Sequence, residues 1–463
     1  MAITSINPAT GKTIKIYDEM TPEQAAAAVT QAHETWRTWR ATSFAERAKP
    51  MKKTAEMLRK RKDELAKLMA VEMGKPLMQG AAEAEKCAWA CDYYADNAEA
   101  HLAPDVIKTE GAKSYVAFEP LGVVLAIMPW NFPLWQVYRF AAPALMAGNV
   151  GVLKHASNVP GCALIIEEIF NQAGFPEGAF CSLLIGNAQV RAVIEHPLVR
   201  AVTLTGSTPA GKAVASQAGA VLKKTVLELG GSDPYVVLED ADLDQAVQTC
   251  VNSRLINAGQ SCIAAKRFIV VEPVRAPFTE RFVALMKTKK MGDPLKEGTE
   301  IVPRLGPNVR SQARHNLRDD LHKQVLASVE RGAKLLLGGE VPPGAGAYYP
   351  PTVLADVKPG MPAYDEELFG PVAAIIGAKD EEDAVRIAND TIFGLGAAVF
   401  TKDTERGERI ARKLEAGSTF VNSAVASDPR LPFGGIKESG YGRELGSYGI
   451  KEFVNAKTVY VKG

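Results

Sequence analysis

The sequence predicts an α/β fold, in which alternating strands and helices build a doubly wound parallel sheet. From about residue 115 onward, short runs rich in β-branched and aromatic residues alternate with helical stretches, a pattern typical of parallel βαβ units. The 463 residues suffice for two or three domains, and 47% hydrophobic and 23% charged residues are ordinary values for a globular protein.

The expected elements begin with helices. Residues 21–70 are rich in Ala, Glu, Lys, Arg and Leu at helical spacing and predict two amphipathic helices. The first begins at Thr21-Pro22-Glu23, because Thr21 can cap a helix, a proline suits the first turn and an acid stabilises the positive end of the helix dipole. The expected strands are residues 123–127, 150–154, 180–184, 201–205, 235–238 and 268–271, with helices at 159–174 and 208–219 among them.

Charge and cysteine usage exclude several classes of protein. The net charge of +1 argues against nucleic-acid and membrane-surface partners, because neither acidic partner is attracted overall. The N-terminus has no leader pattern and no apolar run approaches the roughly 18 residues that span a bilayer, so we expect a cytoplasmic protein. Cys87 and Cys91 would share a helix face with no His nearby, which predicts buried apolar packing. The chain has no HExxH pattern, so we expect no metal.

Cys262 lies in a small glycine-containing stretch, residues 257–262, and is the candidate nucleophile. A free thiol is only a few per cent ionised near neutral pH, so it needs a lowered pKa or a nearby base to attack. Glu228 begins an upstream Glu-Leu-Gly-Gly run, and its carboxylate can activate the water that releases an acyl group. The pair predicts an enzyme that forms a thioester.

Two further segments are ambiguous when each is taken alone. Residues 206–211 follow an expected strand and open a helix, where backbone N–H groups can bind phosphate. A plain strand-to-helix turn is equally consistent, because G-x-T-x-x-G departs from the dinucleotide fingerprint. Asn131, within residues 129–133, carries two N–H donors that can stabilise an oxyanion. The alternative is that Asn131 caps the following helix, with Pro133 just inside it.

Taken together, these motifs resemble the NAD(P)-dependent aldehyde dehydrogenase superfamily. The resemblance runs from Asn7-Pro8-Ala9-Thr10-Gly11 to the C-terminus and rests on residues 129–133, 206–211, 228–231, 259–262, 367–371 and 432–435. It implies an aldehyde dehydrogenase fold with a Rossmann-like cofactor domain (residues 1–101 and 120–230), an α/β catalytic domain (231–428) and oligomerisation or bridging elements (102–119 and 429–463). A small β-hairpin near 102–119 would pair with another subunit, so we expect a homodimer or homotetramer.

The resemblance also implies roles for single residues. Cys262 matches the nucleophile that attacks the aldehyde carbon to give a thiohemiacetal, and Asn131 with the backbone N–H of Cys262 matches the oxyanion hole. After hydride passes to the nicotinamide, Glu228 matches the base that activates water for thioester hydrolysis. The residues that match cofactor contacts are Trp130, Lys154, Ser157, Gly206, Ser207, Gly211, Glu367 and Phe369.

The choice between NAD and NADP is expected to depend on the position three residues after Lys154. Relatives specialised for NAD often carry Glu there, and that carboxylate would repel the 2′-phosphate of NADP by several kcal/mol at about 4 Å and intermediate dielectric. This chain has Ser157, which is small, uncharged and able to donate a hydrogen bond. We therefore expect NADP to be accepted and preferred over NAD.

Within the superfamily the chain is most similar to succinate-semialdehyde dehydrogenases, particularly in residues 135–139 and 427–430. Arg139 would share a helix face with Trp135 and could clamp the distal carboxylate of a semialdehyde, with Ser427, and Arg430 as a further candidate. The alternative is an Arg139 paired with a neighbouring acid at the surface. The resemblance also places Phe433 at the substrate site.

Two positions depart from the family pattern. Some succinate-semialdehyde dehydrogenases carry a second Arg six residues before the nucleophile, where this chain has Ile256. Ala264 stands where some relatives have a Cys that forms a redox-switch disulfide, so we expect no reversible disulfide inactivation.

Three alternatives stay open beside oxidation of succinate semialdehyde. They are a dehydrogenase for another ω-carboxylate semialdehyde or a broad range of aldehydes, a CoA-acylating enzyme, and a catalytically silent binding protein. Glu228 argues against CoA acylation because a hydrolytic base would destroy the thioester. The presence of Cys262, Glu228 and Asn131 argues against a silent scaffold.

Overall fold

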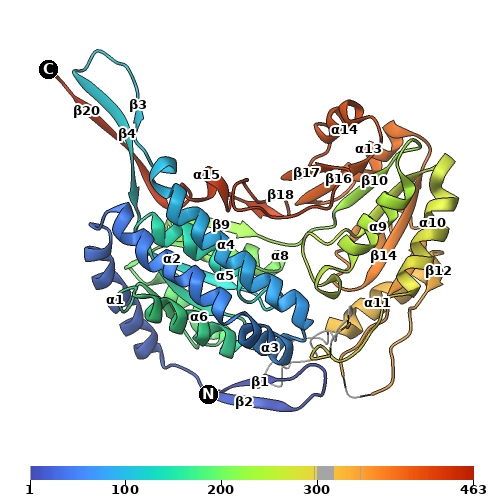
Figure 1. Cartoon of the computed structure of the whole chain (residues 1–463), viewed down its shortest axis with the longest axis horizontal. Helices are drawn as coiled ribbons and strands as arrows, with labels where there is room; N and C mark the ends of the chain where they lie inside the picture. Colours follow the sequence, from blue (N-terminus) through green and yellow to red (C-terminus); the bar gives the residue numbers. More distant parts are fainter. Residues whose placement is uncertain (1, 297, 300–316, 345) are drawn as a thin grey trace.

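The computed structural model describes residues 2–296, 298–299, 317–344 and 346–463. Two lobes lie side by side, and an arm of strands extends from the outer end of the first lobe (Figure 1). Each lobe is built around its own, mostly parallel, sheet. The predicted α/β class is therefore confirmed.

The first lobe contains a six-stranded sheet with the order β19-β9-β8-β5-β6-β7. Its strands are β5 (Val123–Met128), β6 (Val150–His155), β7 (Phe180–Ser182), β8 (Val199–Thr205), β9 (Lys224–Glu228) and the antiparallel β19 (Gly440–Tyr441). The helices of this region are α5 (Trp135–Met146), α6 (Pro160–Ala173), α7 (Val190–Glu195) and α8 (Thr208–Ala220), with a 3₁₀ turn at Asn187–Gln189. The strand order reverses at β5, between β6 and β8, and ligands bind outside the carboxyl ends of strands at such a point.

The helices that precede this sheet differ in number from the prediction. Residues 21–70 contribute to three helices, α1 (Pro22–Trp39), α2 (Phe44–Lys60) and α3 (Lys62–Met73), and α4 (Leu77–His101) follows. Thr21 begins α1 as predicted, because its Oγ1 accepts from Gln24 N at 3.2 Å while Gln24 accepts from Thr21 N at 2.8 Å. Only Arg61 separates α2 from α3, and a one-residue break leaves the helical spacing of the sequence almost unchanged. Cys87 and Cys91 are fully buried on α4, as predicted.

The second lobe contains a seven-stranded sheet with the order β12-β13-β14-β11-β10-β16-β17. Its strands are β10 (Pro234–Val237), β11 (Arg267–Val271), β12 (Lys334–Leu337), β13 (Thr352–Ala355), β14 (Val372–Ala378), β16 (Gly396–Phe400) and β17 (Ser418–Val421). Its helices are α9 (Leu243–Arg254), α10 (Glu272–Lys287), α11 (Leu317–Glu330), α12 (Pro362–Asp365), α13 (Glu381–Asn389) and α14 (Thr404–Ala411). Alternate strand residues enter two separate cores, with Val236 and Ile269 in one and Tyr235 and Phe268 in the other.

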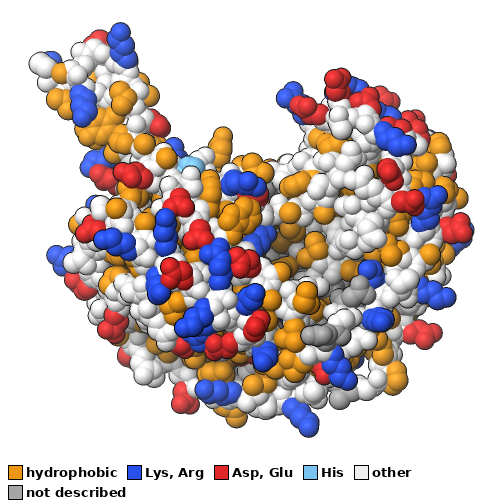
Figure 2. Space-filling model, in the orientation of Figure 1, with side chains coloured by type: hydrophobic (Ala, Val, Ile, Leu, Met, Phe, Trp, Pro, Cys, Tyr) orange, Lys and Arg blue, Asp and Glu red, His pale blue; other side chains and the backbone are white. Residues whose placement is uncertain are grey.

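The arm is a three-stranded antiparallel sheet of β3 (Asp105–Val106), β4 (Lys113–Pro120) and β20 (Val454–Val461). The remaining elements are short: β1 (Ala2–Ile6), β2 (Thr13–Asp18), β15 (Phe393–Gly394), β18 (Ile436–Lys437), α15 (Gly446–Gly449) and a 3₁₀ turn at Ile256–Gly259. In the described ranges, no helix is both long and apolar enough to cross a bilayer. Charges of both signs are interspersed over the face in Figure 2.

Candidate active site

Predicted site residues from four separate segments meet at the carboxyl edge of the first sheet. Asn131 follows β5, the Lys154–Ser157 segment ends β6, Gly206 follows β8 and Glu228 ends β9. Thr205 and Glu228 are opposite each other in the parallel register of β8 and β9, and Gly206 N donates to Glu228 O at 2.9 Å. The expected phosphate-binding turn and the expected base are therefore directly adjacent.

Cys262 reaches this edge from the second lobe, in a loop with an unusual backbone. Asn257, Ala258 and Gly259 have φ of 51°, 56° and 76°, in the left-handed region where residues other than glycine are disfavoured. Gly259 is required because an added Cβ would lie 2.3 Å from Gly370 O. Backbone strain of this kind is kept only where the surrounding contacts hold the loop in place.

Those contacts connect the Cys262 loop to Asn131. Asn257 Nδ2 donates to Asn131 O at 2.7 Å, and Asn131 Nδ2 donates to Gln260 O at 2.9 Å. Gln136 Nε2 donates to Asn131 Oδ1 at 3.1 Å, which fixes the orientation of the amide. Since an amide nitrogen has two hydrogens, one N–H of Asn131 is committed to the loop and one is left for a ligand.

Asn131 does not cap the following helix, so that alternative is wrong. The helix α5 begins at Trp135, and the backbone N–H groups of Leu134 and Trp135 both donate to Glu83 Oε1 at 2.9 Å. A buried carboxylate from α4 thus performs the capping that the sequence made possible for Asn131.

Lys266 binds the backbone of the Cys262 loop, although no motif in the sequence indicates a role for this lysine. The buried ammonium donates to Ser261 O at 3.0 Å and to Cys262 O at 2.6 Å. It also pairs with Glu367 Oε1 at 3.3 Å, and the same oxygen accepts from Gly231 N at 3.2 Å. Glu367 therefore connects the Cys262 loop with the turn that follows Glu228.

The thiol of Cys262 is neutral in this environment. Burial raises the pKa of Cys262 to about 12, although the positive charges of Lys266 and Arg139 act in the opposite direction. At neutral pH the sulfur must lose its proton during attack rather than before it, so a proton acceptor is required.

Glu228 has the properties of a base that can activate water. Burial raises the pKa of Glu228 to about 8, and repulsion from Glu444 adds to this while Arg139 and Arg443 oppose it. Within the described part of the chain, no side chain donates a hydrogen bond to its carboxylate. A base whose pKa lies near the working pH can both take up and release a proton, which suits general-base catalysis.

The expected cofactor residues form a cradle that suits a dinucleotide. The first turn of α8 has no side-chain cap at Ser207, so its N–H groups face outward. Gly211 allows α8 to pack against Leu229, because an added Cβ would lie 2.4 Å from the Leu229 side chain. Lys154 Nζ donates to Asn187 Oδ1 at 2.8 Å at the end of β6. Near the Cys262 loop, the Trp130 and Phe369 rings meet edge to face with centroids 6.0 Å apart.

Arg139 is held by a neighbouring acid in the interior of the molecule. The guanidinium is buried, its Nε forms an ion pair with buried Glu444, and its Nη2 donates to Thr205 Oγ1 at 3.2 Å. It also lies over the Phe433 ring, 4.7 Å from the centroid. Arg139 is thus paired with an acid, as the alternative held, but in the interior rather than at the surface. Its positive charge also acts on Glu228 and Cys262, and its contact with a substrate carboxylate stays a prediction.

The other substrate candidates separate into two groups. Trp135 and Ser427 are buried and share a neighbour, because Lys86 Nζ donates to Ser427 Oγ at 2.8 Å and lies 4.4 Å from the Trp135 ring centroid. Arg430 is exposed and forms a two-point ion pair with Asp428, so it is not a free cation for a substrate. Lys86 is therefore a cation beside two expected substrate residues, and no sequence motif indicated it.

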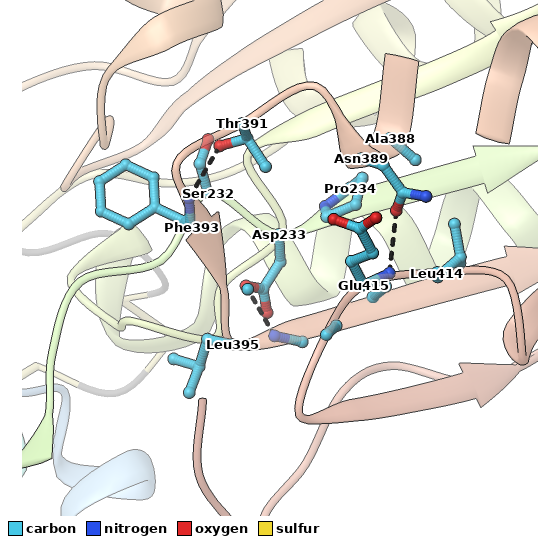
Figure 3. Close-up of a pocket in the computed structure, with 14 residues that line it drawn as sticks. Ser232, Asp233, Pro234, Ala388, Asn389, Thr391, Phe393, Leu395, Leu414 and Glu415 are labelled. Carbon is cyan, nitrogen blue, oxygen red and sulfur yellow. Dashed lines mark hydrogen bonds between the residues drawn. The ribbon is translucent and has the colours of Figure 1, made fainter. Parts of the chain in front are cut away.

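A second buried carboxylate, Asp233, lies just beyond the Glu228 turn and has a structural role. Burial raises the pKa of Asp233 to about 7, and its Oδ1 accepts from Gly396 N at 3.1 Å. Figure 3 shows this side chain in a small pocket between β10 and the loop that contains Phe393 and Leu395. The contact joins the start of β10 to the start of β16, its neighbour in the sheet.

The site combines a cradle for a dinucleotide, a thiol on a hydrogen-bonded loop and a buried carboxylate without a hydrogen-bond donor among the described side chains. This combination defines the class of an oxidoreductase that acts through an acyl–enzyme. Comparison with known proteins identifies the family: residues 1–459 match the model of the aldehyde dehydrogenase family, and the chain belongs to this family. The predicted superfamily and fold are therefore confirmed.

Individual relatives cover the whole chain. A probable NADP(+) succinate-semialdehyde dehydrogenase of Synechocystis is 51% identical over 461 residues, with 100% of both chains covered. An NADP(+) succinate-semialdehyde dehydrogenase of Mycobacterium avium is 49% identical, with 100% of this chain and 97% of the relative covered. The crystal structure of a succinic semialdehyde dehydrogenase of Streptococcus pyogenes in complex with NADP+ is 38% identical, covers 100% of both chains and superposes with a TM-score of 0.96.

Proposed function

We propose that this chain oxidises succinate semialdehyde to succinate with NADP as the preferred cofactor. The observation that carries the proposal is the meeting of Cys262, Asn131 and Glu228 at the carboxyl edge of the cofactor sheet. Relatives about half identical over the full chain, which are named for this substrate and for NADP(+), support the substrate and the cofactor.

In the proposed reaction, the Cys262 sulfur attacks the aldehyde carbon and its proton is released to solvent, so that Glu228 stays deprotonated for the later hydrolysis step. The oxyanion that forms receives hydrogen bonds from Asn131 Nδ2 and the backbone N–H of Cys262, and one such donor contributes roughly 3 kcal/mol. Bound NADP supplies the acceptor for the hydride that leaves the thiohemiacetal carbon. Glu228 then takes a proton from water, which attacks the thioester carbon, and succinate leaves as the Cys262 thiol is restored.

The cofactor would be held by the residues of the cradle. The outward N–H groups at the start of α8, beside Gly206 and Ser207, suit the pyrophosphate. Lys154 and Ser157 suit the adenosine ribose with its 2′-phosphate, and Glu367 suits the nicotinamide ribose, with Trp130 and Phe369 packed nearby. We infer that Ser157 permits the 2′-phosphate because it adds no negative charge at this position.

The preference for NADP is expected to reverse in Ser157→Glu. A carboxylate about 4 Å from the 2′-phosphate would repel it by several kcal/mol at intermediate dielectric, so kcat/KM for NADP should fall about 100-fold or more. The value for NAD should change little. Ser157→Gln is the matched control, because it adds nearly the same volume without the charge. Equal losses in the Glu and Gln variants would contradict the electrostatic explanation.

The substrate proposal is tested by a panel of aldehydes assayed with NAD and with NADP. We expect succinate semialdehyde to give the highest kcat/KM, well above uncharged aldehydes of the same length such as butanal, and NADP to exceed NAD. Similar values for all aldehydes would instead favour the broad-range alternative.

We also infer that the arm pairs with another subunit in a homodimer or homotetramer. It projects away from the body of the molecule (Figures 1 and 2), and it exposes apolar side chains of Val106, Ile107, Tyr460 and Val461. Unpaired edges and exposed apolar strands are unfavourable in a monomer. The division into cofactor, catalytic and bridging segments stays a proposal that the two main sheets support, as does a cytoplasmic location.

A further inference from the structure

Lys86 is a cation that the proposed mechanism does not use. It lies on α4, three residues after Glu83, and its ammonium contacts Ser427 Oγ at 2.8 Å and the face of the Trp135 ring, 4.4 Å from the centroid. These two partners come from α5 and from a loop near the C-terminus, and both are residues expected at the substrate site. Three distant segments therefore place one positive charge at that site.

The ammonium of Lys86 forms no ion pair with any carboxylate in the described part of the chain. An ammonium has three donors, and Ser427 accepts one of them. The nearby acids are committed elsewhere, because Glu83 pairs with Lys75 and Asp428 pairs with Arg430. A partly buried cation without a counter-charge is unfavourable unless an anion joins it.

The electrostatic surroundings agree with this geometry. Burial, together with repulsion from Arg139, lowers the pKa of Lys86 to about 8. The side chain still carries its charge near neutral pH, and an arriving anion would relieve both unfavourable contributions.

We propose that Lys86, with the Ser427 hydroxyl as a second donor, binds the distal carboxylate of the substrate. The inference rests on the proposed function and deepens it, because it names the group that distinguishes an ω-carboxylate aldehyde from an uncharged one. Arg139 is paired with Glu444, whereas Lys86 has no carboxylate partner among the described residues. The face of the Trp135 ring holds the ammonium in place.

The test compares succinate semialdehyde with butanal in the full-length enzyme, saturated with NADP. In Lys86→Met, which keeps the length and apolar packing of the side chain, kcat/KM for succinate semialdehyde should fall about 10- to 100-fold, as expected for a hydrogen bond to a charged group. The value for butanal should stay within about threefold of the wild type. Lys86→Arg should retain most of the preference for the acid. Lys52→Met is the matched control, because Lys52 is an exposed lysine on α2 that pairs with Asp96 on α4.

The ratio of the two kcat/KM values is the decisive quantity, since it does not depend on the fraction of enzyme that is folded. If the wild type prefers succinate semialdehyde and Lys86→Met keeps that preference, the assignment of Lys86 is overturned while the proposed function stands. If the wild type shows no preference, the proposed substrate fails and the assignment fails with it. Should Lys86→Met not fold, Lys86→Gln provides the same ratio with a polar side chain.

Discussion

Replacing Cys262 with serine is expected to lower kcat by about 10⁴-fold or more. A serine hydroxyl is a far weaker nucleophile than a thiol, and the loop offers it no dedicated base like the histidine of a serine hydrolase. Removing a nucleophile in other enzymes costs losses of this order. The measurement is NADPH formation at saturating aldehyde and cofactor, alongside cofactor binding followed by fluorescence.

The control for this variant is Cys250→Ser. Cys250 is fully buried on α9, and burial keeps its pKa well above the usual range, so its thiol is inert. The Cys250 variant should keep its activity once folded, while the Cys262 variant should still bind cofactor. Undiminished activity of Cys262→Ser would show that no thioester forms on this sulfur.

Replacing Glu228 with glutamine is expected to separate acylation from hydrolysis. Without a base to activate water, the thioester should persist, so mixing should give a burst of at most one NADPH per site followed by turnover about 10²–10⁴-fold slower. Intact-protein mass spectrometry should then find the succinyl group on Cys262. Glu438→Gln, which changes a half-buried acid paired with Lys212, should leave turnover unchanged.

The pH dependence supplies a second readout of the same residue. A base is active only when it is deprotonated, and the pKa of Glu228 is raised to about 8. The rate of hydrolysis in the wild type should therefore rise with pH toward 8 and level off above it, and Glu228→Gln should lose this rise. Fast steady-state turnover in the variant, with no acylated enzyme, would assign the base to another group.

The reactive residues were predictable from the sequence because each stands in a short motif whose spacing is itself recognisable. Cys262 and Glu228 stand beside glycines in tight turns, where few other residue types fit. Gly259 is an example, because an added Cβ there would collide with Gly370. The strands were predictable for a similar reason, since β5, β6 and β8 are buried along almost their whole length and need runs of apolar residues. The single break at Arg61 was missed because it barely shifts the helical spacing.

Side-chain partners were not predictable in this way. Arg139 and Glu444 are about 300 positions apart, and only the packing of α5 against the C-terminal segment brings them together as a buried ion pair. Lys86 illustrates the converse, because an ordinary lysine on a helix becomes a candidate anion site only when Ser427 and Trp135 arrive beside it.

The sequence by itself determined the class of fold, the family and the reacting atoms, because these follow from local patterns of apolar residues, glycines and reactive side chains. The tertiary structure alone decided which charges are free and which are neutralised. Electrostatic pairing depends on distances of a few ångströms between segments that are remote along the chain, and burial multiplies the effect of each such contact.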